Sequence, residues 1–434
     1  MNADASGAAT GTLRAWSMVA ILSTLYIVSF VDRFVLGLLV GPLKADLGVS
    51  DLQIGFLFGT AFAVFYGIVG IPVARLADKG DRRRLILAGV GLWSCCTILS
   101  GFSSTFLALV LLRIGLAVGE AVLTPATYSL IGDVLPKERR GLAASIYNAC
   151  GMFGASGAYI VAALAIGWIY AVESSGELGG LKLWQVIFII VGVPGLVLAT
   201  LFALVAREPA RSTVPGLAGA PTLRDVMRYA VGNARLYFAL FLGAGCLQIM
   251  TNAYLAWGPT FLSRTYGMPV AEAGRTYGLF NMLALVGGTI LIPMLTRRLR
   301  RPDALPLVSA ACGFVGGGFC LAAPLQGTAT GFLALAWAGL FLAGGGGNNV
   351  LAAIHSIVPR PMQATMTALL LICMSTLALG VGPLAAAFFA GLAAGAANPL
   401  AMGLMIVSVL AAAVGVTLFA LARAPVAAYV TANR

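Results

Sequence analysis

Residues 52–103 read LQIGFLFGTAFAVFYGIVGIPVARLADKGDRRRLILAGVGLWSCCTILSGFS. Apolar residues fill this stretch on both sides of a short charged segment, DKGDRRR at 78–84. A helix needs about 20 predominantly apolar residues to cross a bilayer, and both flanking runs come close to or exceed that length. The pattern therefore predicts two membrane-spanning helices joined by a short basic loop.

The same pattern continues in both directions along the 434 residues, of which 60% are hydrophobic and 10% charged. This composition excludes a soluble enzyme with a single anchor. A transmembrane β-barrel would alternate apolar and polar residues, whereas these runs are continuous. We therefore predict an all-α integral membrane protein with twelve spans, at residues 16–40, 52–77, 85–103, 106–131, 142–168, 184–206, 236–262, 273–296, 305–324, 329–354, 364–392 and 399–423.

The basic residues are segregated between the loops. If the N-terminus lies inside, 21 of the 27 Lys and Arg residues fall on the cytoplasmic side and four on the other. This bias predicts that both termini are cytoplasmic and that the chain lies in the inner membrane of the cell. It also accounts for the net charge of +12 without a nucleic-acid partner, because a basic rim faces anionic lipid headgroups.

One long polar connection, residues 207–233, divides the spans six and six. We predict an N-terminal bundle at 1–206, a cytoplasmic linker at 207–233 and a C-terminal bundle at 234–434. Short patterns at Ile71-Pro72 and Ile292-Pro293 recur at a spacing shared by a second pair of loop patterns. This favours duplication into parallel repeats. Chance similarity of short basic loops is the alternative.

Four charged residues lie well inside the predicted spans of the first half, away from the span ends: Asp32, Arg33, Arg113 and Glu120. Each costs at least about 2.5–3.5 kcal/mol at mid-membrane and needs a reason. Asp32 and Arg113 are expected at similar depth, with Glu120 about 10 Å deeper on the same helix face as Arg113. A carboxyl that alternates between an apolar environment and a guanidinium can bind and release a proton. We predict proton coupling at Asp32 and Glu120, with Arg33 and Arg113 as charge partners; static ion pairs are the alternative.

Polar and aromatic residues within the spans are candidates for a substrate cavity. Neutral amides suit hydrogen bonds to a substrate, but they can equally join helices. The candidates are Tyr26, Tyr147, Asn148, Gln248, Asn252, Asn281 and Asn348. The seven Cys lie within spans and show no CxxC spacing, and no nucleophile is paired with a base. We therefore expect no metal site, no cofactor and no catalytic residues.

Gly151, Gly154 and Gly157 are spaced by three in the predicted fifth span. Such small residues let helices approach closely. We predict a close helix contact along this face.

Twelve spans in two halves, with LADKGDRRR at 76–84, resemble the major facilitator superfamily. Further motifs are similar to its spinster branch: Val31-Asp32-Arg33-Phe34, Trp93-Ser94, Arg113 with Gly119-Glu120-Ala121, and Arg207-Glu208-Pro209. The detailed resemblance covers about residues 20–210. It implies proton-linked or facilitated export of lipids or amphipathic compounds, with Asp32 and Glu120 in the proton role and Arg113 as their partner.

The loop between the second and third spans also has a physical interpretation. Asp78, Lys79, Arg82 and Arg83 form a candidate gating loop. A carboxylate at Asp78 would interact favourably with the N-terminus of the eleventh helix, which starts near Pro361. We predict that this contact latches the two halves together on the inside.

The leading interpretation is a secondary active transporter that exports a lipid-like or amphipathic small molecule with protons, by alternating access. Transport of small organic anions or drugs is the nearest alternative, and a channel or a transport-like sensor are alternatives from other classes. No enzyme activity is expected. We expect a monomer in contact with membrane lipids.

Overall fold

The computed structural model describes residues 2–172, 178–209, 221–299, 301 and 304–432. Twelve of its helices are long and apolar enough to cross a membrane, which confirms the predicted fold class. Helices of the first half are α1 (Asn2–Phe34), α2 (Leu36–Leu47), α3 (Asp51–Gly55), η1 (Phe56–Thr60), α4 (Ala61–Lys79), α5 (Arg82–Ser100), α6 (Phe106–Glu120), α7 (Leu123–Val134), α8 (Lys137–Val172) and α9 (Leu183–Val205). Those that follow are α10 (Leu223–Gly232), α11 (Ala234–Tyr266), α12 (Val270–Arg298), α13 (Ala304–Ala322), η2 (Ala323–Leu325), α14 (Ala329–Ile357), η3 (Arg360–Met362), α15 (Gln363–Leu392) and α16 (Pro399–Ala432).

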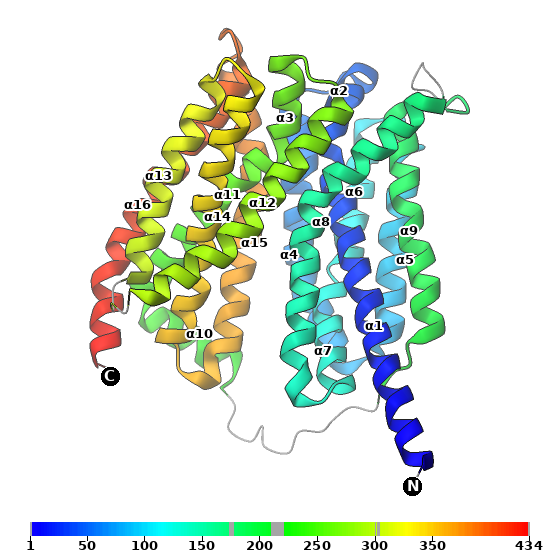
Figure 1. The fold of residues 1–434 in the computed structure, drawn as a ribbon, viewed down its shortest axis with the longest axis vertical. Coiled ribbons are helices and arrows are strands. Elements are labelled where there is room, and N and C mark those ends of the chain that lie inside the picture. Colours follow the sequence, from blue (N-terminus) through cyan, green and yellow to red (C-terminus); the bar gives the residue numbers. More distant parts are fainter. Residues whose placement is uncertain (1, 173–177, 210–220, 300, 302–303, 433–434) are drawn as a thin grey trace. The chain divides into compact units, whose positions relative to one another are not determined.

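The chain forms two compact units. The first contains Met1–Val49, Ala61–Thr213 and Val270–Gly278, and the second contains Ser50–Thr60, Val214–Pro269 and Leu279–Arg434. Within the first unit, α1 packs against α8 and α9; within the second, α11 packs against α15 and α16 (Figure 1). Each unit includes one short segment that the sequence analysis assigned to the other half: 270–278 in the first unit and 50–60 in the second.

The expected linker at 207–233 contains a helix of its own. Thr222 and Asp225 form a reciprocal capping box at the start of α10. Such a box satisfies backbone N–H groups that the first helical turn leaves unpaired. The Asp225 carboxylate accepts hydrogen bonds from the hydroxyl and the backbone N–H of Thr222. These bonds lower the pKa of Asp225. Residues 210–220 of the linker lie outside the described part of the chain.

Two helix interruptions adjoin the charged residues. α1 ends at Phe34 and α2 begins at Leu36, directly after Asp32 and Arg33. Together they continue to Leu47, beyond the expected end of the span at residue 40. α6 ends at Glu120 and α7 begins at Leu123. Pro125 accounts for the second interruption, because proline lacks the N–H that would continue the helical ladder.

The glycine face of α8 is shorter than predicted. A Cβ on Gly154 would lie 2.9 Å from Phe30 Cβ and 3.0 Å from Ile27 Cα, so α8 packs directly on α1 there. Gly151 lies against the Tyr26 ring in the same way. The prediction is wrong for Gly157, where a Cβ would meet nothing within 4 Å. Each step of three residues turns the helix by about 300°, so Gly157 has rotated away from α1.

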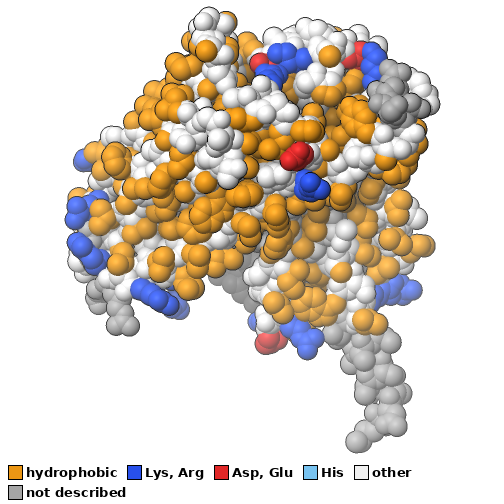
Figure 2. All heavy atoms as spheres, turned by 45° about the horizontal axis from the view of Figure 1, so that its top comes forward, with side chains coloured by type: hydrophobic (Ala, Val, Ile, Leu, Met, Phe, Trp, Pro, Cys, Tyr) orange, Lys and Arg blue, Asp and Glu red, His pale blue; other side chains and the backbone are white. Residues whose placement is uncertain are grey.

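The exterior is largely apolar. Leu204, Phe314 and Leu392 expose 74%, 72% and 71% of their surfaces. Figure 2 shows hydrophobic side chains over most of the visible face, with Lys and Arg in small groups. A surface of this kind suits a lipid environment and would favour association in water.

Candidate functional site

Arg33 and Glu120 form a buried ion pair between α1 and α6. The Arg33 Nη2 donates a hydrogen bond to Glu120 Oε2. Their side chains expose only 9% and 1% of their surface. Charged groups so far from water persist only when they are paired. The pair therefore joins the first predicted span, 16–40, to the fourth, 106–131.

Aromatic rings surround the Arg33 guanidinium. Its Cζ lies 4.2 Å from the centre of the Phe62 ring, 4.8 Å from that of Phe30 and 5.5 Å from that of Tyr66. A cation close to an aromatic ring is attracted by its quadrupole. The sequence analysis missed Phe62 and Tyr66, because nothing in their spacing separates them from other apolar residues of the second span.

Asp32 is the most deeply buried of the four charged residues. Asp32 is fully buried, with 0% of its surface exposed. Neither of its carboxylate oxygens has a hydrogen-bond partner among the described residues. Glu120 and Arg113 are its charged neighbours. The Thr97 hydroxyl also lies near the carboxylate but donates its hydrogen bond to the Trp93 carbonyl. A buried carboxylate without hydrogen bonds is costly as an anion.

Arg113 contacts Asp32 through the backbone. Its Nη1 donates to the Asp32 main-chain carbonyl oxygen at 3.0 Å. Its Nη2 is buried and has no partner in the described part of the structure. Asp32 and Arg113 were expected at similar depth in the membrane, and they are in contact. Depth alone does not determine the direction in which each side chain leaves its helix. Asp32 and Arg33 are neighbours on a helix and point about 100° apart, so Arg33 is the residue that pairs with Glu120.

The aromatic candidates of the first half lie together. Tyr26 and Tyr147 stack with their ring centres 4.3 Å apart, and the Tyr147 hydroxyl lies 3.3 Å from Thr124 Oγ1. Asn148 is exposed and lies beside Tyr128. Tyr26 and Tyr147 thus belong to an aromatic group that includes the rings around Arg33.

The amide candidates of the second unit are more scattered. Gln248 accepts a hydrogen bond from Thr251 at 2.9 Å, and Asn252 donates to the Gln248 carbonyl at 3.1 Å, both within α11. Asn348 donates to Thr289 at 2.9 Å, which joins α14 to α12. Asn281 is buried with 2% exposure. For Asn348 the contact matches the interhelical alternative left open by the sequence.

The gating-loop arginines form a cluster at the end of the first unit that carries the N-terminus. Arg82 is 1% exposed and pairs with Asp133 and with Glu208 Oε1, the latter at 2.7 Å. Arg83 donates through its backbone N–H to Glu208 Oε2 at 3.0 Å. The side chains of Asp78 and Lys79 lie outside the described residues. The cluster of Arg82, Asp133 and Glu208 joins the start of α5, the end of α7 and the segment after α9, and these pairings were not predicted from the sequence.

The twelve spans and the buried charges define a multi-pass membrane protein with an internal polar site. The model of the Major Facilitator Superfamily matches residues 22–383. This chain therefore belongs to that superfamily of membrane transporters, as its resemblance implied.

Curated relatives include several transporters. An MFS-type efflux pump of Mycolicibacterium smegmatis is 31% identical over 296 residues, which cover 68% of this chain and 65% of that protein, slightly less than two thirds of its length. A probable L-galactonate transporter of Escherichia coli is 26% identical, with 78% and 75% covered. Protein spinster of Drosophila melanogaster is 24% identical, with 71% and 50% covered.

Among solved structures, a bacterial homologue of the human lysosomal transporter spinster, crystallised in an inward-facing and unoccupied conformation, has a similar fold. Its TM-score is 0.83 at 24% identity, with 97% of this chain and 98% of that chain covered. The match supports the twelve-helix architecture over almost the whole chain.

Proposed function

We propose that this transporter exports a lipid-like or amphipathic small molecule and couples its movement to protons by alternating access. Asp32 carries the proton, and Glu120 is a second proton-coupling group that exchanges its contact with Arg33 during the cycle. The similarity to an efflux pump supports export. The amphipathic substrate is proposed from the spinster-like motifs around these residues.

The observation that carries the proposal is the environment of Asp32. Its carboxylate is buried and has no hydrogen bond to any described residue. The Arg113 guanidinium donates through Nη1 to the Asp32 backbone carbonyl, and its Nη2 has no partner within the same residues. Protonation removes the charge from this carboxyl. Deprotonation gives Arg113 an anionic partner, so the two protonation states favour different local arrangements.

Transport of a small organic anion is a second candidate. Relatives named as probable transporters of L-galactonate, galactarate or D-glucarate, and sulfoacetate cover more than 60% of this chain. The guanidinium groups of Arg33, which lies among aromatic rings, and of Arg113 could bind the carboxylate of such a substrate. Arginine presents donors in a planar fork that suits carboxylates.

A substrate screen in proteoliposomes distinguishes these candidates. A fluorescent lysophospholipid, a lipophilic cation and L-galactonate are each tested with an imposed pH gradient. Gradient-driven movement of the lysophospholipid or the cation supports the first proposal, and movement of L-galactonate alone supports the second. Currents far above the turnover of a conformational cycle would overturn both in favour of a channel.

The basic loops also support a location. We propose that the chain lies in the inner membrane with both termini in the cytoplasm, because of the Lys and Arg bias. We also propose that it acts as a monomer. Cysteine labelling from each side of intact cells tests this orientation.

A further inference from the structure

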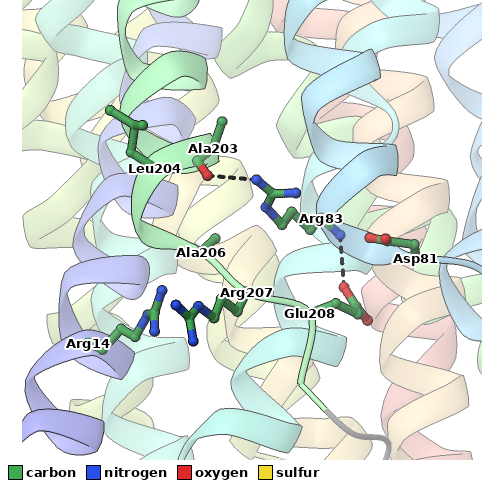
Figure 3. Close-up of a pocket in the computed structure, with 8 residues that line it drawn as sticks. All are labelled: Arg14, Asp81, Arg83, Ala203, Leu204, Ala206, Arg207 and Glu208. Carbon is green, nitrogen blue, oxygen red and sulfur yellow. Dashed lines mark hydrogen bonds between the residues drawn. The ribbon is translucent and has the colours of Figure 1, made fainter.

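A cavity of about 330 Å³ lies at the end of the first unit that carries the N-terminus. It is formed by the start of α1, the start of α5 and the segment around the end of α9. Arg14, Arg83 and Arg207 line it together with Asp81 and Glu208 (Figure 3). This cavity is separate from the buried Arg33–Glu120 pair.

Both acidic residues of the cavity are already engaged by other groups. Asp81 accepts the Arg84 backbone N–H at 2.9 Å and pairs with its side chain at 3.2 Å. Glu208 pairs with Arg82 and accepts the Arg83 backbone N–H. The cavity therefore presents more uncompensated positive charge than its lining residues alone suggest.

Two arginines use only part of their guanidinium groups on protein. Arg14 Nε donates to the Val205 carbonyl at 2.8 Å, and Arg83 Nη2 donates to the Ala203 carbonyl at 2.6 Å. Both carbonyls belong to the last turn of α9, where cations are favourable. Arg83 Nε is buried without a partner among the residues that the structure describes.

Arg207 has no polar partner for its side chain in the described ranges of the chain. Figure 3 shows the guanidinium groups of Arg207 and Arg14 pointing toward each other. Like charges in this arrangement repel unless an anion lies between them. Two guanidinium forks can each donate paired hydrogen bonds to one phosphate, which matches their planar geometry.

We propose that this cavity binds a phosphate group held by Arg14 and Arg207, with Arg83 at its inner wall. Apolar neighbours favour a phospholipid headgroup as its source. Leu204 lines the cavity and exposes 74% of its surface. Leu13, which precedes Arg14 in the sequence, exposes 70%. Basic pockets at the cytoplasmic ends of membrane helices suit anionic headgroups, and the exposed leucines can contact an acyl chain.

The test uses the purified full-length protein in detergent, and it measures thermal unfolding during titration with dioleoylphosphatidylglycerol, dioleoylphosphatidylcholine or inorganic phosphate. Arg207→Gln removes a guanidinium that makes no hydrogen bond in the described structure, so it should fold normally. Arg139→Gln is the matched control, because Arg139 is an exposed arginine on α8 whose side chain forms no hydrogen bond or ion pair within the described residues.

Phosphatidylglycerol should stabilise the parent and Arg139→Gln at concentrations at least tenfold lower than those needed to stabilise Arg207→Gln. Phosphatidylcholine should stabilise the parent less than phosphatidylglycerol does. An equal or stronger effect of inorganic phosphate, again lost in Arg207→Gln, would identify a free phosphate as the ligand. Identical titrations for Arg207→Gln and the parent with both phosphates would overturn the proposal.

Discussion

Adjacent residues in α1 have different environments. Arg33 has a carboxylate and three aromatic rings around it, whereas the carboxylate of Asp32 has no hydrogen bond within the described structure. A helix turns by about 100° per residue, so the two side chains reach different neighbours. One position can therefore serve structure while the next is available for protonation.

Glu120→Gln tests the paired position. It keeps the shape of the side chain but removes the charge that compensates Arg33. We expect loss of proton-driven transport with substrate binding still measurable. We also expect destabilisation by about 3–5 kcal/mol, as for other buried pairs broken on one side. Uptake in proteoliposomes and thermal unfolding in detergent measure the two effects.

The double variant Arg33→Gln/Glu120→Gln is the control for stability. Removing both charges together should cost less than the sum of the single changes, because no buried charge is left uncompensated. Full gradient-driven transport by Glu120→Gln would refute its proton role.

Gly154→Ala tests the close contact of α8 with α1. The added Cβ would lie 2.9 Å from Phe30 Cβ and 3.0 Å from Ile27 Cα, which is closer than ordinary van der Waals contact. We expect a loss of about 1–3 kcal/mol from overpacking. Gly157→Ala faces open space and should be neutral or stabilising by up to about 1 kcal/mol. Equal melting temperatures for both variants would contradict this packing.

At the scale of elements, the start of α15 bears on gating. Met362, its N-cap, offers no side-chain hydrogen bond to the first turn. Exposed backbone N–H groups at a helix start favour a nearby carboxylate. That Asp78 contacts this helix start stays a prediction from the sequence.

Asp78→Asn should shift the population toward the inward-open state. A contribution of about 1–2 kcal/mol corresponds to a shift of roughly 5- to 30-fold in the conformational equilibrium. Distance labels on each face of the protein can measure the inward-open fraction. Equal fractions in variant and parent would mean that Asp78 acts only in folding or topology.

The spans were predictable because hydropathy alone determines which segments can cross a bilayer. Their ends differ by a few residues, as at Leu47, where the helix continues past the expected boundary. The gathering of Asp32, Arg33, Arg113 and Glu120 followed from depth, since buried charges need partners. Their actual pairing depends on rotation and on the interruptions near Val35 and Pro125, which depth arithmetic does not contain.

The cluster of Arg82, Asp133 and Glu208 was beyond sequence reasoning for a similar reason. Arg82, Asp133 and Glu208 lie far apart in the chain and meet only because three helix ends converge. A charged residue at a helix end has an ordinary explanation in topology or solvation. The sequence therefore gave no reason to expect Arg82 to be buried.

At the scale of the whole molecule, proton coupling requires that one buried carboxyl gains and loses a proton as the protein changes state. Asp32 has the environment expected of that group. Asp32→Asn makes the side chain at position 32 permanently neutral and keeps its volume similar. The variant should still exchange substrate across the membrane, because exchange needs no net proton movement. It should fail to accumulate substrate against its gradient.

The most direct measurement compares pH-gradient-driven accumulation with substrate exchange at equal pH, in proteoliposomes containing the parent, Asp32→Asn or Glu272→Gln. Glu272 is an exposed carboxylate on α12 and serves as the matched control. The parent and Glu272→Gln should accumulate substrate, while Asp32→Asn should exchange it but not accumulate it. Accumulation by Asp32→Asn equal to that of the parent would contradict proton coupling through Asp32.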